Sequence, residues 1–151
     1  MISEVIVRFL QALLPLVETE EGIFEWTGIF FPTGRGRFRL SEDNLISLSP
    51  EMYREFIVPG VRAVSQHVRA SGAWSVNASD GNLWPVIDDF LLGCEVDGYI
   101  EIDFQAGMDL RRLKDAYGDR ITFFGNLDCG TILSFGTPEE VRFHTHDCLK
   151  A

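Results

Sequence analysis

One type of junction, in which a β-rich segment leads through a polar turn into a helical segment, constrains the fold of this chain more than any other feature. Residues 73–78 are β-rich and pass through Asp80-Gly81 into a helical segment that Asn82 opens, and similar junctions follow downstream. The β-rich segments are 22–31, 73–78, 98–104 and 121–126, and they alternate with helical segments at 2–14, 49–70, 83–92 and 110–116 and after Thr137. Alternation at this spacing predicts an α/β fold with four parallel strands joined by right-handed crossovers.

Length, charge and cysteine content narrow the class of protein. The 151 residues fit one domain, and the net charge of -10 argues against nucleic acid or an anionic membrane surface as a partner. The three cysteines are an odd number without C-x-x-C spacing, which indicates neither a disulfide framework nor a zinc ribbon. This cysteine usage fits the reducing cytoplasm. Arg8 and Gln11 interrupt the apolar N-terminal segment, which predicts a helix and not a signal peptide. We therefore expect a soluble protein.

A polar segment, 32–44, follows the first β-rich segment and is predicted to be a long loop. Arg35, Arg37 and Arg39 alternate within it, so that an extended conformation would place them on one face, where they could bind an anion. The pattern favours the alternative, a solvated basic loop.

Polar side chains at or just after the ends of the strands are the main candidates for a site. Because parallel strands end at the same rim, where α/β proteins bind ligands, these side chains are expected to converge. Two carboxylates sharing a pocket would raise the pKa of one and provide a general acid near neutral pH. The catalytic candidates are Asp80, Asn126, Asp128, Glu42 and Asp43, and the substrate-binding candidates are Asn77, Ser79, Asp103, Asp109 and Arg37. Asp and Asn are also common turn and cap residues, so a purely structural interpretation of part of this set stays open.

Other reactive groups favour packing over chemistry. His144 and Cys148 are four residues apart in the last helical segment, but two ligands do not complete a zinc site. Cys129 follows a strand end, and no adjacent base is identifiable. We predict neither a bound metal nor another cofactor.

Five stretches taken together resemble the uroporphyrinogen decarboxylase superfamily. This superfamily contains the porphyrinogen decarboxylases of haem biosynthesis and the corrinoid methyltransferases that move a methyl group from a corrinoid protein to a thiol. The resemblance runs from about Glu42 to the C-terminus and implies a TIM-type barrel with its active site at the carboxyl ends of the strands. The stretches are S-P-E-M-Y-R-E-F-I-V-P (49–59), S-D-G-N-L-W-P-V-I-D (79–88), A-G-M-D-L-R-R-L-K (106–114), Y-G-D-R-I-T-F-F-G-N-L-D (117–128) and G-T-P-E-E-V (136–141).

The departures from the family pattern leave its two branches open. The methyltransferases' His-x-Cys zinc motif aligns on Ala78 and Asp80, which do not preserve it. The segment that holds the catalytic aspartate of decarboxylases has no match. A-G-M-D-L and S-D-G-N resemble the methyltransferase-like branch, whereas G-N-L-D also suits the decarboxylases. The implied substrate is therefore either porphyrinogen-like or a methyl donor system.

The chain is about half the length of a whole barrel, so the resemblance implies a partial TIM-type (β/α) barrel. Four parallel strands cannot close, and both outer strands are expected to expose unpaired backbone groups. A second copy or a complementary half-barrel would cover them and complete the site. The alternative is a truncated or degenerate half-barrel that binds a partner or has no catalytic role by itself. The residues expected near the open inner face are Val76, Ile100, Ile102, Phe123 and Phe124.

Overall fold

The computed structural model describes residues 4–5, 7–8, 11, 37–42 and 45–151, without the side chains of Arg37, Phe38 and Ile46. Residues 4–5, 7–8 and 11 are helical, within the segment predicted to be the first helix. The β-rich segment 22–31, together with Arg35 and Asp43, lies outside the described residues.

Four parallel strands form one sheet in which their spatial order is their order along the chain. The register aligns Arg39 with Val76, Val76 with Gly98, and Gly98 with Thr122. The predicted α/β fold with four parallel strands is confirmed, and consecutive parallel neighbours are the arrangement found in a TIM barrel. The strands are β1 (Arg37–Ser41), β2 (Trp74–Ala78), β3 (Gly98–Ile102) and β4 (Thr122–Gly125).

The prediction of a loop over 32–44 is wrong, because β1 lies inside it and pairs with β2 along its whole length. Two arginines within five residues of strand made the segment look solvated. The guanidinium of Arg39 is instead paired with Glu101 on β3, 62 residues further along the chain. Such a distant compensating charge cannot be seen in the local sequence.

The crossover between β1 and β2 contains a helix that changes its type in the middle. A short 3-10 helix, Leu45–Ser47, precedes α2 (Pro50–Met52), which continues into a π-helical turn, Tyr53–Ile57, and then α3 (Val58–Ala70). The hydroxyl of Ser49 caps α2 by accepting a hydrogen bond from the Met52 N–H at 3.3 Å. Pro59 has no N–H for a regular helical bond, which explains the π-helical turn before it and the change of helix type within the segment 49–70.

Of the remaining helices, α4 (Leu110–Tyr117) and α6 (Pro138–Lys150) begin at side-chain caps that the sequence contains. Residues 83–92 form a 3-10 helix (Trp84–Val86) and a π-helical turn (Asp89–Gly93) in place of the regular helix expected there. Asp109 caps α4, which ends at Gly118. A short α5 (Ile132–Phe135) precedes α6, which opens with a capping box of Thr137 and Glu140.

The hydrophobic core lies between the sheet and its helices. Phe90 and Tyr99 are fully buried in it, with ring centroids 5.0 Å apart in an edge-to-face contact. Ile102 also belongs to this core and Phe123 packs against it, so the expectation that they lie at the open inner face is wrong. Val76 is only 2% exposed, which contradicts its expected exposure as well.

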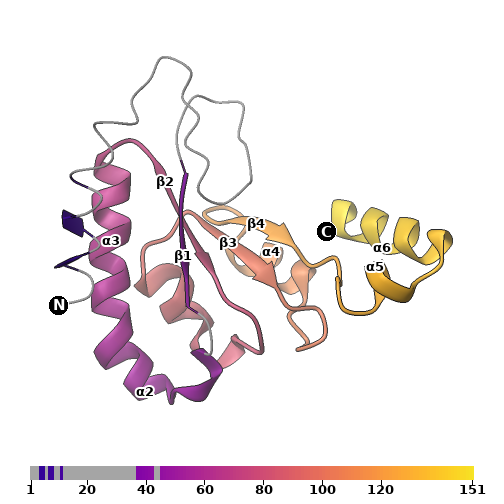
Figure 1. Cartoon of the computed structure of the whole chain (residues 1–151), viewed down its shortest axis with the longest axis horizontal. Coiled ribbons are helices and arrows are strands. Elements are labelled where there is room, and N and C mark those ends of the chain that lie inside the picture. Colours follow the sequence, from indigo (N-terminus) through magenta and orange to yellow (C-terminus); the bar gives the residue numbers. More distant parts are fainter. Residues whose placement is uncertain (1–3, 6, 9–10, 12–36, 43–44) are drawn as a thin grey trace.

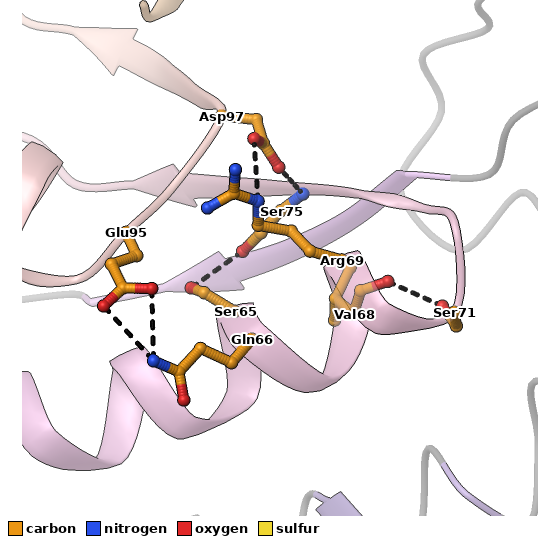
Figure 2. A network of polar contacts seen from close by, with 8 residues as sticks. All are labelled: Ser65, Gln66, Val68, Arg69, Ser71, Ser75, Glu95 and Asp97. Atoms are coloured by element: carbon orange, nitrogen blue, oxygen red, sulfur yellow. Dashed lines mark hydrogen bonds and ion pairs between the residues drawn. The ribbon is translucent and has the colours of Figure 1, made fainter.

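Polar contacts fix the amino ends of β2 and β3 to α3 (Figure 2). The hydroxyl of Ser75 donates to that of Ser65 at 2.9 Å, and the Asp97 carboxylate accepts from the Ser75 N–H at 2.9 Å. Arg69 of α3 forms an ion pair with Asp97 at 3.4 Å. These contacts secure the end of the sheet opposite to the candidate site.

α5 and α6 lie beyond β4, at the end of the molecule opposite to α3 (Figure 1). No residue of α6 is buried, and Phe135, Phe143 and Leu149 are 85%, 69% and 80% exposed. Within the described residues, β4 pairs with β3 alone and is an edge strand. Large exposed apolar side chains of α5 and α6 therefore lie on the side of the molecule where the sheet ends in an open edge (Figure 1). None of the helices in the described part of the chain has the length and apolar character needed to cross a bilayer.

Candidate functional site

Glu42 follows β1 directly and is attached to the carboxyl end of β2. Its backbone N–H donates to the Ala78 carbonyl at 2.8 Å, and the Ser79 hydroxyl donates to the Glu42 carbonyl at 3.0 Å. Its side-chain Oε1 accepts a hydrogen bond of 2.7 Å from the amide Nδ2 of Asn77. Glu42, Asn77 and Ser79 therefore form one hydrogen-bonded group at the rim, in which Asn77 and Ser79 are fully buried.

The environment of Glu42 favours its protonated form. Burial raises the pKa of the Glu42 carboxyl from 4.5 to about 7, and the neighbouring Tyr53 hydroxyl offsets only part of this rise. The hydroxyl of Tyr53 lies 3.5 Å from the Cys94 sulfur, and burial raises the pKa of that thiol to about 12. Cys94 is thus an unreactive thiol at neutral pH, while Glu42 exchanges a proton in the range where many enzymes work.

Asp80 and Asp103 follow neighbouring strands but have different surroundings. The carboxylate of Asp103 accepts hydrogen bonds from the N–H groups of Gly81 and Ala106, both at 3.0 Å, and so ties the loops after β2 and β3 together. Asp80 is exposed, and its side chain forms no hydrogen bond or ion pair with the described part of the chain. Of the two, Asp80 is the carboxylate available to a ligand.

Asn126 and Asp109 line a cavity of about 250 Å³ between the loop after β3 and α6. The amide of Asn126 donates to the carbonyl groups of Met108 at 2.8 Å and Ile102 at 3.3 Å. Asp109 accepts from the Arg112 N–H at 3.0 Å as the cap of α4. Both side chains therefore hold the rim in shape, and neither contacts the Glu42 group.

Asp128 is enclosed by the turn that follows β4. Its carboxylate accepts from the side chains of Thr131 and Gln105 and from the backbone N–H groups of Gly130 and Thr131. These bonds, the Thr131 hydroxyl above all, lower the pKa of Asp128 to about 2. With its oxygens bonded to its own turn and to Gln105 in the loop after β3, Asp128 is a fixed anion in this arrangement.

Three residues that shape this rim are not among the candidates expected from the sequence. Arg39 pairs with Glu101, which stands at an irregularity in the β3 register with a positive φ of 70°. Tyr53 is the third residue. The sequence contains one indication of its position: Ser49-Pro50 fixes the start of its helix, so a large side chain one turn later faces the sheet. The side chain of Arg37, like Asp43, lies outside the described residues.

The region that carries the rim matches a known family. A family model described as uroporphyrinogen decarboxylase (URO-D) matches residues 40–151. The chain belongs to the uroporphyrinogen decarboxylase family. The match begins in β1 and includes β2, β3 and β4 with their crossovers, so that Glu42 and Asp80 lie inside the region shared with the family. A search of curated proteins and a search of solved structures found no match to the chain.

The described residues of this member of the uroporphyrinogen decarboxylase family contain no group of side chains arranged as a metal site. No three His, Cys, Asp or Glu side chains within this part of the chain are grouped so that they could hold an ion. The ring of His144 packs edge-on against Phe104 and Phe143, with centroids 5.5 and 5.7 Å apart. His144 is thus placed by aromatic packing between α6 and the loop after β3.

Proposed function

We propose that this chain forms part of the active-site rim of a cytoplasmic decarboxylase of the uroporphyrinogen decarboxylase superfamily, acting on a small, carboxylated, porphyrinogen-like molecule. The observation that carries this proposal is the buried carboxyl of Glu42, whose pKa is about 7, together with the exposed carboxylate of Asp80, which has no side-chain partner among the described residues. Both follow the ends of adjacent parallel strands, where a barrel enzyme holds its substrate. Asn126 and Asp128 would shape the same rim from the end of β4.

Decarboxylation needs a proton where the carboxylate leaves. The bond between carbon and carbon dioxide breaks, its electron pair stays on the carbon, and that carbon takes up a proton. Glu42 would donate this proton and recover it from solvent, because an acid with a pKa near the working pH is both protonated and able to give its proton away. Asp80 would accept hydrogen bonds from N–H groups of the substrate and so orient the reacting carbon.

The methyltransferase branch receives less support. Transfer of a methyl group to a thiol depends on a thiolate, which a bound metal can provide. The position at which the resemblance places the first metal ligand of that branch is occupied by Ala78, which has no donor atom. The absence of this donor favours the carboxy-lyase reaction over methyl transfer.

We further propose that a second half-barrel completes the site. The described rim carries the carboxylates of Asp80 and Asp103, which repel a carboxylated substrate, and the nearby guanidinium of Arg39 is already paired with Glu101. Cations for the substrate would then come from the completing half. The edge of β4 and the exposed Phe143 and Leu149 of α6 are the surface to which it would bind.

The same exposed surface supports a second candidate function, a non-catalytic half-barrel that only binds a partner. Light scattering on Phe143→Asp tests the surface, with Phe56→Asp as a matched control, since Phe56 is 65% exposed in the turn before α3. Self-association that is lost in Phe143→Asp and kept in Phe56→Asp would identify α6 as the interface. A monodisperse wild-type monomer that melts cooperatively would contradict the need for a second copy.

An activity assay then separates the candidates. The chain, at rising concentration and with any half-barrel encoded by a neighbouring reading frame, is incubated anaerobically with a carboxylated porphyrinogen and, in parallel, with a methylated corrinoid and a thiol. Loss of carboxyl groups from the porphyrinogen, abolished in Asp80→Asn and kept in Glu139→Gln on the exposed surface of α6, is the expected result. Methyl transfer alone would assign the other branch, and inactivity of the assembled barrel would leave the binding role.

A further inference from the structure

Two buried oxygens at the rim have no hydrogen-bond donor among the described residues. They are Oε2 of Glu42 and Oδ1 of Asn77. Both belong to planar groups that already share one hydrogen bond, from Asn77 Nδ2 to Glu42 Oε1 at 2.7 Å. Two buried acceptors without donors are costly, because each has lost its hydrogen bonds to water.

We infer that Glu42 and Asn77 form a cyclic acid–amide pair, in which the amide N–H donates to Glu42 Oε1 and a proton on Glu42 Oε2 donates to Asn77 Oδ1. One proton then satisfies both oxygens. A carboxylic acid and a primary amide are complementary in this way, since each has one donor and one acceptor on the same edge. Asn77 is thus a positioning residue, which fixes the place of the proton that the proposed function assigns to Glu42.

The pairing also explains why Asn77 lies where it does. Its side chain is fully buried, and its Nδ2 is 3.5 Å from the Phe90 carbonyl, which limits rotation of the amide. When Glu42 gives its proton away, the bond from Nδ2 becomes a hydrogen bond to an anion and grows stronger, while Oδ1 loses its donor. Asn77 therefore supports Glu42 both before and after proton transfer.

The other groups that face Glu42 are neutral at physiological pH. The hydroxyl of Tyr53 lies on the π-helical turn, and the thiol of Cys94 follows Gly93. Burial raises the pKa of the Tyr53 hydroxyl and of the Cys94 thiol. From β2 and the residue after it come the uncharged Asn77 and Ser79. The charges of Arg62 and Asp89 affect Cys94 and are not among the causes that shift the pKa of Glu42. Within the described residues, the proton shared with Asn77 is thus the titrating one at this site.

The test is a carbon-13 NMR titration of the Glu42 carboxyl in the intact chain, with the Asn77 side-chain amide followed in the same samples. The expected result is a Glu42 midpoint near pH 7, with the Asn77 amide signals moving at the same midpoint. In Glu42→Gln, whose amide can form the same two bonds, the Asn77 signals should no longer move. A midpoint near the ordinary value of 4.5 would overturn the pair and indicate a water molecule between the two oxygens.

A variant of the partner measures the balance of the two bonds. In Asn77→Ala, Glu42 loses both the acceptor for its proton and the N–H that donates to its carboxylate, and these two losses shift the midpoint in opposite directions, so a net shift of less than roughly 1 pH unit is expected. A rise of roughly 2 pH units would mean that Asn77 acts only as a donor to the carboxylate, which contradicts the pair. If this variant does not fold, the wild-type titration alone decides. Since no substrate is present, the outcome is independent of whether the chain proves to be a decarboxylase.

Discussion

Replacement of Glu42 by Gln should remove a large part of the pH dependence of stability above about pH 5. The folded chain holds the Glu42 proton up to a pKa of about 7, whereas the unfolded chain releases it near 4.5. Folding therefore costs more as the pH rises through this window, and the loss is complete once the pH exceeds the folded pKa. Gln carries no proton to lose, so the variant should lack this decrease.

The magnitude follows from the two pKa values. A separation between 4.5 and about 7, at about 1.4 kcal/mol per pH unit, gives an upper limit between about 3 and 4 kcal/mol. Because the residue is half-buried, partial screening by solvent reduces the expected difference to roughly 2 kcal/mol. Glu42→Gln should thus match the wild type below about pH 4 and exceed its stability by roughly this amount near pH 8.

Urea unfolding at a series of pH values measures this difference directly. Glu139→Gln is the control, because Glu139 is exposed on α6 and its loss should leave the pH dependence unchanged. Equal pH dependence in the wild type and Glu42→Gln would refute the reasoning, since it would show that Glu42 ionises alike in the folded and unfolded chains. A destabilised Glu42→Gln at alkaline pH would mean that the carboxylate, and not the acid, is the form that the fold requires.

Three further predictions concern the rim and the sheet. In thermal melts, Asp80→Ala should change stability by less than about 0.5 kcal/mol. Asn82→Ala, which loses the 3.1 Å hydrogen bond from the Trp84 N–H, should cost about 1 kcal/mol. Equal, large losses in the two variants would remove Asp80 from the site. Gly98→Ala should destabilise the chain by roughly 1–3 kcal/mol in urea, because its Cβ would stand 3.1 Å from the Phe124 ring and the Thr122 carbonyl, and a neutral change would show that the strands can move apart. Asp128→Asn should lower the free energy of unfolding above the ordinary aspartate pKa of 3.8, and the difference from the wild type should vanish as the pH falls through about 2. A loss of stability that persists in acid would show that packing, and not the charge of Asp128, is responsible.

The sequence predicts the sheet well because each strand after β1 has a local signature. Strands β2, β3 and β4 are runs of β-branched and aromatic residues that end in polar turns, and the helices between them carry caps at Ser49, Asp109 and Thr137. Strand β1 lacks such a signature. Its arginines are tolerated because Arg39 finds Glu101 two strands away, and that contact depends on the register of the whole sheet.

The candidate site, like the sheet, could be predicted in part from local sequence and in part could not. That polar side chains gather at the carboxyl ends of parallel strands can be predicted, because topology alone brings those ends together. Which of these side chains are free to bind a ligand cannot be predicted, because Asp103, Asp128 and Glu42 differ only in their three-dimensional surroundings. The raised pKa of Glu42 arises from burial under Tyr53 and Asn77, and the expected second carboxylate in its pocket is not its cause.

The rate of carbon dioxide release as a function of pH, measured on the assembled barrel with a carboxylated porphyrinogen, tests the central claim most directly. If Glu42 supplies the proton, the rate should fall as the pH rises through about 7, and Glu42→Gln should be slow at every pH. A Glu42→Gln variant that releases carbon dioxide at the wild-type rate, with the same pH profile, would contradict the assignment of the buried carboxyl as the acid of this site.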